Sequence, residues 1–407
     1  MVYKKEIVKG ISFTGSLRFL TKGVGFLETI ILARILVPEQ FGAYGIALLA
    51  LGLLETITQT GVNIVLIQEK ETDRYISSAW FVSILRGVAI MIILAAVAPV
   101  IAHFFNAPQA TILLYFISIV PLLRGFINPA VVKLQKELLF GKNFWYQSII
   151  LIIDTVTSIT LTYITKNPIG IVYGLIAGVI IEVILSFIII TPRPTFRFDQ
   201  EYIKKIFHRG KWVTATAIFD YLFFNIDNIA VGRLLGASAL GIYQLAYSLA
   251  VTPLVELGNV FGYVMFPVLR KLSENREQLR ESYLKALLSI IALSIPFVAI
   301  FTLAPHIFVL LLGEKWKMIA TILPVLSILG FIKSISNVSS ALFWSDIRQK
   351  YVTVITLVTT FGMVVLLVPL ITAYGILGAS YSALIGAVLS IPFVFFYTIK
   401  LLQVKKK

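Results

Sequence analysis

The sequence of 407 residues contains no cysteine, so disulfides, thiolate metal ligands and cysteine nucleophiles are excluded. Its only histidines, His103, His208 and His306, are far apart along the chain and lack the spacing of a metal site. Charged residues are scarce as well, at 14% of the chain. A water-soluble enzyme that uses a metal or a thiol is therefore not expected, and we predict no bound cofactor.

Apolar residues are abundant instead. Hydrophobic residues make up 58% of the chain, and the mean hydropathy is +0.92, which is more apolar surface than a water-soluble core could hide. The apolar segments reach about 20 residues or more, the length of a membrane-spanning helix. They also lack the even alternation of barrel strands. The sequence predicts an all-α integral membrane protein.

The net charge of +15 fits a membrane protein better than a nucleic-acid-binding one. A domain that binds a polyanion would gather its basic residues on one soluble face, whereas here the basic residues lie mostly in the connecting loops. Loops rich in Lys and Arg stay on the cytoplasmic side of a membrane. We therefore predict a multi-pass protein of the cell (cytoplasmic) membrane with both termini in the cytoplasm.

Twelve spans are predicted, in two groups of six. A charged connector from Thr191 to Lys211 separates the groups and contains a stretch with the pattern of an interfacial amphipathic helix. The predicted domains are an N-terminal six-helix bundle (1–192), a cytoplasmic linker with an amphipathic helix (193–210) and a C-terminal six-helix bundle (211–407). The predicted spans are 10–37, 41–67, 76–103, 110–132, 143–165, 168–190, 210–236, 239–268, 284–312, 318–344, 351–372 and 375–399.

The two groups of spans are copies of each other. Four residues of the first copy recur with the same spacing in the second, and each copy has an acid six residues before its arginine. Later matches pair 125–127 with 330–332, both Gly-Phe-Ile. Because each half has an even number of spans, both halves enter from the same side, which predicts a parallel repeat around a central cavity. The matched residues are Arg34, Leu36, Gly42 and Tyr44 with Arg233, Leu235, Gly241 and Tyr243, and Glu28 with Asp227.

Basic residues stand at membrane depth in several spans. Arg18 and Lys22 share one stripe of the first helix, and a cation there costs about 2.5–3.5 kcal/mol even on the lenient insertion scale. One interpretation is a wall of cations for an anionic ligand, and the other is a structural ion pair or a snorkelled Arg18. Lys333 and Asn337 form a second polar stripe, on the tenth span.

Arg86 and Arg124 are two further basic residues within spans, the third and the fourth. We count them among the candidate substrate-binding residues. Two other roles stay open, since Arg86 could reach the headgroups on the cytoplasmic side and Arg124 could cap a kink after Pro121. The candidate substrate-binding residues are Arg18, Lys22, Arg86, Arg124, Lys333 and Asn337.

Acids also lie within the spans, and two interpretations stay open for them. They could bind a coupling proton or Na+ and act as gates, or they could only neutralise the interior bases. For Glu28 with Arg34 and for Asp227 with Arg233, an anchoring role at headgroup level is the preferred interpretation. The candidate coupling or gating residues are Glu28, Glu55, Asp154, Asp220, Asp227 and Glu256.

Residues 22–44, KGVGFLETIILARILVPEQFGAY, resemble the first-helix signature of the polysaccharide flippases of the multidrug/oligosaccharidyl-lipid/polysaccharide exporter superfamily. The resemblance implies alternating-access transport of isoprenoid-pyrophosphate-linked oligosaccharides to the outer leaflet, for cell-surface polysaccharide assembly. It also implies that Lys22 matches a basic residue that holds the pyrophosphate in related lipid II flippases. Glu28 departs from that pattern, because the relatives have a base there.

The implied partners are the lipid-linked oligosaccharide and membrane lipids, with docking of a polysaccharide polymerase or glycosyltransferases left open. We expect a monomer and no nucleic acid. One alternative is a cation-coupled multidrug and toxin extrusion antiporter, which the basic residues at membrane depth argue against. The other is a membrane glycosyltransferase or polymerase on the same lipid carrier, for which the short outer loops leave no room for a catalytic lobe.

Overall fold

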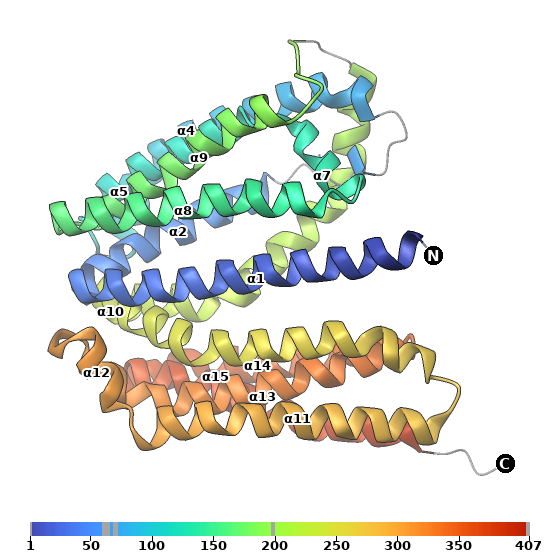
Figure 1. Cartoon of the computed structure of the whole chain (residues 1–407). Coiled ribbons are helices and arrows are strands. Elements are labelled where there is room, and N and C mark those ends of the chain that lie inside the picture. Colours follow the sequence, from blue (N-terminus) through green and yellow to red (C-terminus); the bar gives the residue numbers. More distant parts are fainter. Residues whose placement is uncertain (1, 59–65, 68–71, 197–199, 404–407) are drawn as a thin grey trace. The chain divides into compact units, whose positions relative to one another are not determined.

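The computed structural model describes residues 2–58, 66–67, 72–196 and 200–403, and only the backbone of residues 2–12, 14, 72, 74 and 200–215. Within these ranges all regular structure is helical and there is no β-strand (Figure 1). A helix satisfies its backbone hydrogen bonds within its own segment, which an apolar segment surrounded by lipid must do. The all-α membrane fold predicted from the sequence is confirmed.

The chain divides into two compact units, Met1–Asn225 and Ile226–Lys407. In the first unit, α1 packs on α8, α8 packs on α9, and α4 packs on α5 and α6. The unit also contains the first part of the long helix α10 (Gln200–Lys271). Its other helices are α1 (Val2–Ile35), α2 (Pro38–Ile57), α4 (Thr72–Phe104), α5 (Ala110–Ile117), α6 (Ile119–Gly125), the 3-10 turn η1 (Pro129–Val132), α7 (Lys133–Lys136), α8 (Phe140–Thr165) and α9 (Ile169–Ile189).

The second unit begins within α10 and has its closest helix packing between α14 and α15, with α13 in contact with α11 and α15. A cluster of buried apolar side chains that includes Leu269, Tyr283 and Leu342 forms part of its core. Its remaining elements are α11 (Arg276–Leu303), α12 (His306–Leu312), the 3-10 turn η2 (Glu314–Trp316), α13 (Ile319–Ser345), α14 (Gln349–Tyr374) and α15 (Ile376–Leu402).

In the described ranges, nine helices are long and apolar enough to cross a membrane, or ten when one bent pair is counted as a span. The longest, Thr216–Lys271, covers two of the predicted spans, and its helix is broken at Gly236, where φ is +83°. That backbone angle favours glycine, since other residues meet a steric penalty there. With α1 added and the two arms of α10 separated, the helices match the twelve predicted spans.

The predicted fourth span, 110–132, is not one continuous helix. It is broken at Ser118 into α5 and α6, and the segment Ala110–Gly125 is bent by 74° against Pro129–Lys136. Pro121 contributes to the first break because it lacks an N–H group, and Pro129 starts the next turn. Broken helices at membrane depth occur where the backbone is enclosed by protein or lines a cavity.

Close packing of α4 and α6 fixes the position of this broken span. A Cβ at Gly125 would lie 2.8 Å from the carbonyl oxygen of Ser83 and 2.9 Å from the Cα of Ile84, so only glycine lets the two helices come this near. At Gly87, one turn further along α4, a Cβ would meet the carbonyl oxygen of Pro121. The contact places Arg86 and Arg124, which neighbour these glycines in sequence, on facing helices.

The division between the units falls at Asn225, whereas the sequence places the second bundle at residue 211. Helix α10 begins at Gln200 and continues through the predicted linker into the span without a break in its helical backbone until Gly236. The side chains of the predicted amphipathic stretch lie outside the described residues. The three-part domain division therefore stays a prediction.

Candidate functional site

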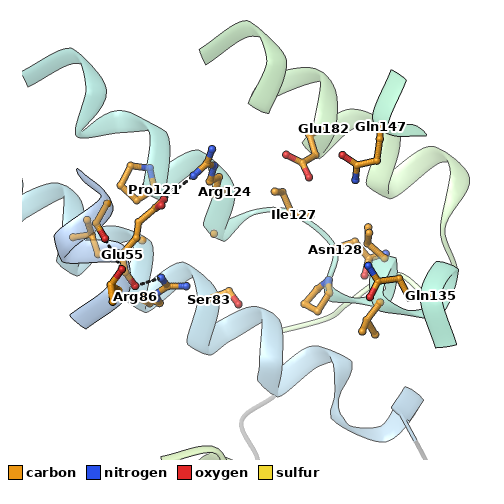
Figure 2. Close-up of a pocket in the computed structure, with 18 of the residues that line it drawn as sticks. Glu55, Ser83, Arg86, Pro121, Arg124, Ile127, Asn128, Gln135, Gln147 and Glu182 are labelled. Atoms are coloured by element: carbon orange, nitrogen blue, oxygen red, sulfur yellow. Dashed lines mark hydrogen bonds and ion pairs between the residues drawn. The ribbon is translucent and has the colours of Figure 1, made fainter. Parts of the chain in front are cut away.

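A cavity of about 630 Å³ lies inside the N-terminal unit (Figure 2). Its walls come from α2, α4, the broken span α6–η1–α7, the first turns of α8, and α9, and Tyr221 of α10 adds to the lining. The Tyr221 hydroxyl donates a hydrogen bond of 2.7 Å to the carbonyl oxygen of Leu49, which fixes this part of α10 against α2. Ligand pockets have volumes of roughly 300–1,000 Å³, so the cavity has the size of a binding site.

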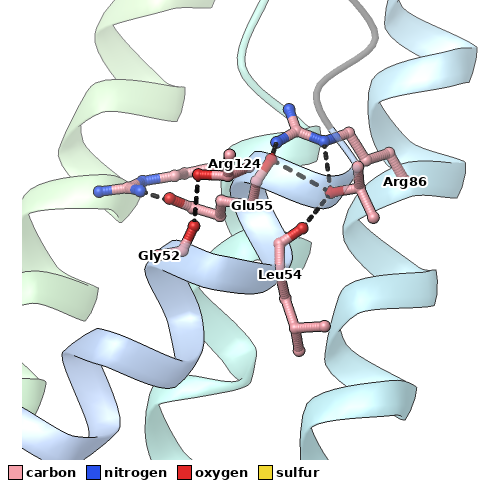
Figure 3. A network of polar contacts seen from close by, with 7 residues as sticks. Gly52, Leu54, Glu55, Arg86 and Arg124 are labelled. Carbon is pink, nitrogen blue, oxygen red and sulfur yellow. Dashed lines mark hydrogen bonds and ion pairs between the residues drawn. The ribbon is translucent and has the colours of Figure 1, made fainter. Parts of the chain in front are cut away.

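Three of the predicted site residues meet in this cavity (Figure 3). Arg124, in the last turn of α6, forms an ion pair with Glu55 of α2, with 2.7 Å between Nη1 and Oε1. Arg86 of α4 donates from Nη2 to the backbone carbonyl oxygen of Glu55 at 2.7 Å and from Nε to Thr58 Oγ1 at 3.1 Å. The carbonyl groups at the end of α2 carry partial negative charge, which a guanidinium neutralises.

The end of the cavity that lies away from Arg86 and Arg124 is lined by side chains that carry no positive charge. Figure 2 shows Glu182 and Gln147 on one side of it and Asn128 and Gln135 on the other. The Asn128 side chain is committed to the fold, since it accepts from Ala130 N at 3.0 Å and donates to backbone carbonyl oxygens, including that of Pro192 at 3.1 Å. Glu182, Gln135 and Gln147 are not among the candidate residues predicted from the sequence.

The polar residues that sequence reasoning missed could have been found from their spacing. Asn143 and Gln147 both line the cavity and stand four residues apart in the first turns of α8, so they share one face of that helix. The sequence does not reveal that α7 and α9 bring Gln135 and Glu182 to the same place, because that depends on the bends of the fourth span.

Two further predicted acids, Glu28 and Asp154, lie together between α1 and α8. Thr155 Oγ1 donates to Glu28 Oε2 at 3.0 Å, and Ser158 Oγ donates to Asp154 Oδ1 at 3.1 Å. The two carboxyl groups are near enough to repel each other when both are ionised. The two acids and their two hydroxyl partners form a second polar cluster in the N-terminal unit.

Arg18 and Lys22 lie on α1 with exposed side chains, and neither belongs to the lining of the cavity in the described part of the unit. Arg34, near the end of α1, is exposed as well. The structure therefore does not bring the stripe of α1 together with Arg86 and Arg124. Whether Lys22 contacts a substrate stays a prediction.

In the C-terminal unit the predicted residues Asp227, which is buried, and Lys333, which is half-buried, each bond to a tyrosine of α10. Asp227, 6% exposed, accepts from the Tyr243 hydroxyl at 2.9 Å and from the backbone N–H of Asn228 at 2.8 Å. Lys333 Nζ donates to the Tyr247 hydroxyl at 2.8 Å and lies 5.3 Å from the centre of that ring. The two tyrosine rings are 6.2 Å apart, centre to centre.

The other predicted residues are dispersed. Asn337 donates to Asn259 Oδ1 at 2.8 Å, which ties α13 to the second arm of α10. Glu256 is half-buried on that arm, whereas Asp220 is exposed on the first arm of α10, in the N-terminal unit. Among the described residues, no group of three or more His, Asp or Glu side chains is placed to hold a metal ion.

A family of proteins described as "Polysaccharide biosynthesis protein" matches residues 31–321 of the chain. The lipopolysaccharide biosynthesis protein WzxC of Escherichia coli (strain K12) is 24% identical over 352 residues, which are 86% of this chain and 72% of that protein. The teichuronic acid biosynthesis protein TuaB of Bacillus subtilis (strain 168) is 26% identical over 303 residues, 70% of this chain and 59% of that protein. These similarities confirm the family indicated by residues 22–44.

Solved structures share the fold. The lipid II flippase MurJ in an inward closed conformation superposes with a TM-score of 0.71 at 18% identity, covering 96% of this chain and 89% of that one. An inward-facing multidrug resistance transporter of the MATE family gives a TM-score of 0.66 at 16% identity, covering 96% and 98%. At these identities the likeness shows a common multi-pass membrane architecture and leaves the substrate to be argued from the site.

Proposed function

Because the chain belongs to the polysaccharide biosynthesis protein family, we propose that it is a flippase for isoprenoid-pyrophosphate-linked oligosaccharides. It moves them from the cytoplasmic to the outer leaflet by alternating access, for cell-surface polysaccharide assembly. It is a transporter and not an enzyme. The observation that carries the proposal is the interior cavity in which Arg86 and Arg124 come together from two facing helices.

The two arginines suit a diphosphate group. A guanidinium is always charged and presents a planar fork of N–H donors that matches phosphate oxygens. Such charge-assisted hydrogen bonds are about twice as strong as neutral ones, and more so in a cavity shielded from bulk water. Arg86 uses Nε and Nη2, and Arg124 uses Nη1, on Glu55 and Thr58, so each guanidinium keeps further N–H groups for a ligand.

Charge balance in the cavity links substrate binding to uptake of a cation. Two guanidinium groups, Arg86 and Arg124, face two carboxyl groups, Glu55 and Glu182, so the lining is formally neutral. A diphosphate brings extra negative charge and competes with Glu55 for Arg124. A proton or an Na+ ion that enters the cavity with the substrate offsets this added negative charge.

Glu28 and Asp154 serve as a second coupling site in this proposal. Their mutual repulsion is relieved when one of them binds a proton or when a cation lies between them. Both termini lie in the cytoplasm, with the basic residues near the start of α8 on the same side. A monomer in the cell membrane is sufficient for this mechanism, and polymerases or glycosyltransferases meet it only through the shared lipid carrier.

Reconstitution tests the proposal. Proteoliposomes with a panel of lipid-diphosphate-linked saccharides are scored for the appearance of labelled glycan in the opposite leaflet. We expect Arg124→Ala to slow translocation about tenfold or more, because hydrogen bonds to a charged group contribute about 1.5–3 kcal/mol each. Arg280→Ala, which removes an exposed arginine at the start of α11, serves as the matched control and leaves the rate unchanged.

Three outcomes would contradict parts of the proposal. If Arg124→Ala translocates the substrate at the wild-type rate, the cavity does not bind the diphosphate. If Lys22→Ala is slow in the same assay, the binding site lies on α1 instead. A wild-type protein that exports organic cations but no lipid-linked saccharide would establish the antiporter alternative. Translocation that is independent of proton and Na+ gradients would exclude the coupling role of the acids.

A further inference from the structure

Four polar side chains at one end of the cavity have no protein partner. Gln135 of α7, Asn143 and Gln147 of α8, and Glu182 of α9 all line the space. Within the described part of the chain, none of these four side chains forms a hydrogen bond or an ion pair with another residue. Gln135 is exposed and the other three are partly exposed, so their amide and carboxylate groups are open to the cavity and available to a ligand.

The surrounding structure holds these side chains in place. The Tyr146 hydroxyl donates to the backbone carbonyl oxygen of Glu182 at 3.2 Å, which locks α8 to α9 beside Gln147. Tyr146 is itself buried in a cluster with Ala130 and Leu134 of the broken span. That cluster joins α7, α8 and α9, the three helices that supply the polar groups. The arrangement is therefore preorganised, as binding sites require.

The chemistry of this end differs from that of the arginine end. Amide groups both donate and accept hydrogen bonds, and a carboxylate accepts two or more. Together they match the neighbouring hydroxyl groups of a sugar ring, each of which donates and accepts. Glu182 repels a phosphate, and Ile127, Val131 and Val132 add apolar surface on which the C–H face of a ring can pack.

We propose that Gln135, Asn143, Gln147 and Glu182 form a sugar subsite that selects the first sugar attached to the diphosphate. The inference rests on the proposed function, because Arg86 and Arg124 hold the diphosphate at the other end of the same cavity. Figure 2 shows Gln135, Gln147 and Glu182 at one end of the space and the two arginines at the other, with Ile127 between them. A volume of about 630 Å³ is large enough for one sugar with its diphosphate.

The subsite explains how selection works. A sugar that lacks a hydroxyl at the matching position leaves an amide or the carboxylate of the subsite without that partner, and sites built to hydrogen-bond a hydroxyl reject such analogues more strongly than apolar pockets reject a missing methyl group. An acidic sugar meets repulsion from Glu182. Specificity of the transporter for its glycan would therefore be set by the first sugar and by the four residues of the subsite.

Binding of synthetic short-chain lipids to the purified full-length protein tests the inference. The probes are geranylgeranyl diphosphate and the same lipid diphosphate carrying one glucose, galactose, N-acetylglucosamine or glucuronic acid. We expect at least one neutral sugar to increase affinity over the bare diphosphate. Gln147→Ala and Glu182→Ala then each remove about tenfold of affinity for that compound, as expected for a lost hydrogen bond to a buried polar group.

Gln147→Ala leaves the affinity for the bare diphosphate unchanged and Glu182→Ala raises it, since Glu182 repels a phosphate, whereas Arg124→Ala weakens binding of both compounds. Gln403→Ala, at an exposed glutamine after α15, is the matched amide control. Equal losses for the bare and the sugar-bearing compound in Gln147→Ala and Glu182→Ala, or no loss in either, would overturn the subsite. A wild-type protein that binds neither compound would instead overturn the proposed function.

Discussion

In the N-terminal unit Glu28 accepts a hydrogen bond from a threonine hydroxyl and lies near a second acid, Asp154. Its counterpart in the repeat, Asp227, accepts hydrogen bonds from Tyr243, from the backbone of Asn228 and from the Asn228 amide, and is attracted by Lys333. The same position of the duplicated sequence thus carries an acid next to another acid in one unit and an acid balanced by a base in the other.

A second pair of matched positions also differs in charge between the two units. The residue after the repeated Gly-Phe-Ile is Asn128 in the first unit and Lys333 in the second. Asn128 joins backbone groups, whereas Lys333 supplies the positive charge near Asp227. In the C-terminal unit the interior acid and base are each hydrogen-bonded to a tyrosine of α10, whereas in the N-terminal unit Arg86, Arg124 and Glu55 line a cavity. The comparison predicts that charge changes affect stability in the second unit and transport in the first.

The largest effect is expected for Asp227→Ala. The substitution removes the carboxylate that accepts hydrogen bonds from Tyr243 and from two groups of Asn228, and each hydrogen bond to a charged group contributes about 1.5–3 kcal/mol. The matched change in the other unit, Glu28→Ala, removes a charge that another acid repels and costs much less. Thermal unfolding of both variants in the same detergent measures the difference.

A double variant sharpens that test. Asp227→Asn, Lys333→Met and the double variant form a double-mutant cycle, and a loss in the double variant smaller than the sum of the two single losses measures the attraction between the two charges. Equal destabilisation by Asp227→Ala and Glu28→Ala would show that the two acids have the same structural role, and the comparison would be wrong.

The next effect concerns the tyrosines that follow the repeated glycine. Tyr243→Phe removes a hydrogen bond to the Asp227 carboxylate and is expected to cost about 1.5–3 kcal/mol, since the acceptor is charged. Tyr44, the matching residue, packs against Leu32 and Leu36, and its hydroxyl donates to no other residue in the described ranges. Tyr44→Phe therefore changes the unfolding temperature little. A loss as large as that of Tyr243→Phe would contradict the assignment.

Matched glycines give a comparable contrast. A Cβ at Gly125 would meet backbone atoms of Ser83 and Ile84, which cannot move without shifting α4. At Gly330 its nearest contact would be the flexible end of Leu254, at 2.9 Å, with the Ala250 carbonyl oxygen at 3.1 Å. We expect Gly125→Ala to cost about 1–3 kcal/mol, as overpacking does, and Gly330→Ala to cost less. Thermal unfolding of the two variants measures both losses of stability. A larger loss for Gly330→Ala than for Gly125→Ala would contradict the prediction.

The sequence predicts the fold well because the relevant signals are local and strong. Long apolar runs identify the helices, and the recurrence of Arg34 and Tyr44 at Arg233 and Tyr243 identifies the duplication. The break between the seventh and eighth spans also follows from sequence, since it falls at Gly236. The bend of the fourth span is less visible, because Pro121 alone does not specify a break at Ser118.

The site is only partly predictable for a physical reason. Charges at membrane depth are energetically costly, so the sequence alone identifies Arg86, Arg124 and Glu55 as candidate functional residues. Their partners depend on which helices face each other, and Arg18 and Lys22, which look equivalent in sequence, lie outside the cavity lining. Uncharged amides such as Gln135 and Gln147 cost much less to place in a membrane span, so the sequence does not single them out. Only the packing of α7, α8 and α9 brings them together.

The smallest effect on stability, and the most informative one, is expected for Glu28→Gln. Glutamine keeps an oxygen that accepts the hydrogen bond from Thr155 and removes the repulsion from Asp154, so the free energy of unfolding should change by less than about 0.5 kcal/mol or rise slightly.

If the acid pair carries the coupling cation, the same variant loses the acceleration of translocation by an imposed proton or Na+ gradient. Asp227→Asn, the matched change, should instead lower stability and keep the gradient dependence in whatever protein remains folded. Translocation with and without a gradient, measured for both variants, separates a coupling acid from a structural one, and a Glu28→Gln protein that still responds fully to the gradient would assign both acids to structure.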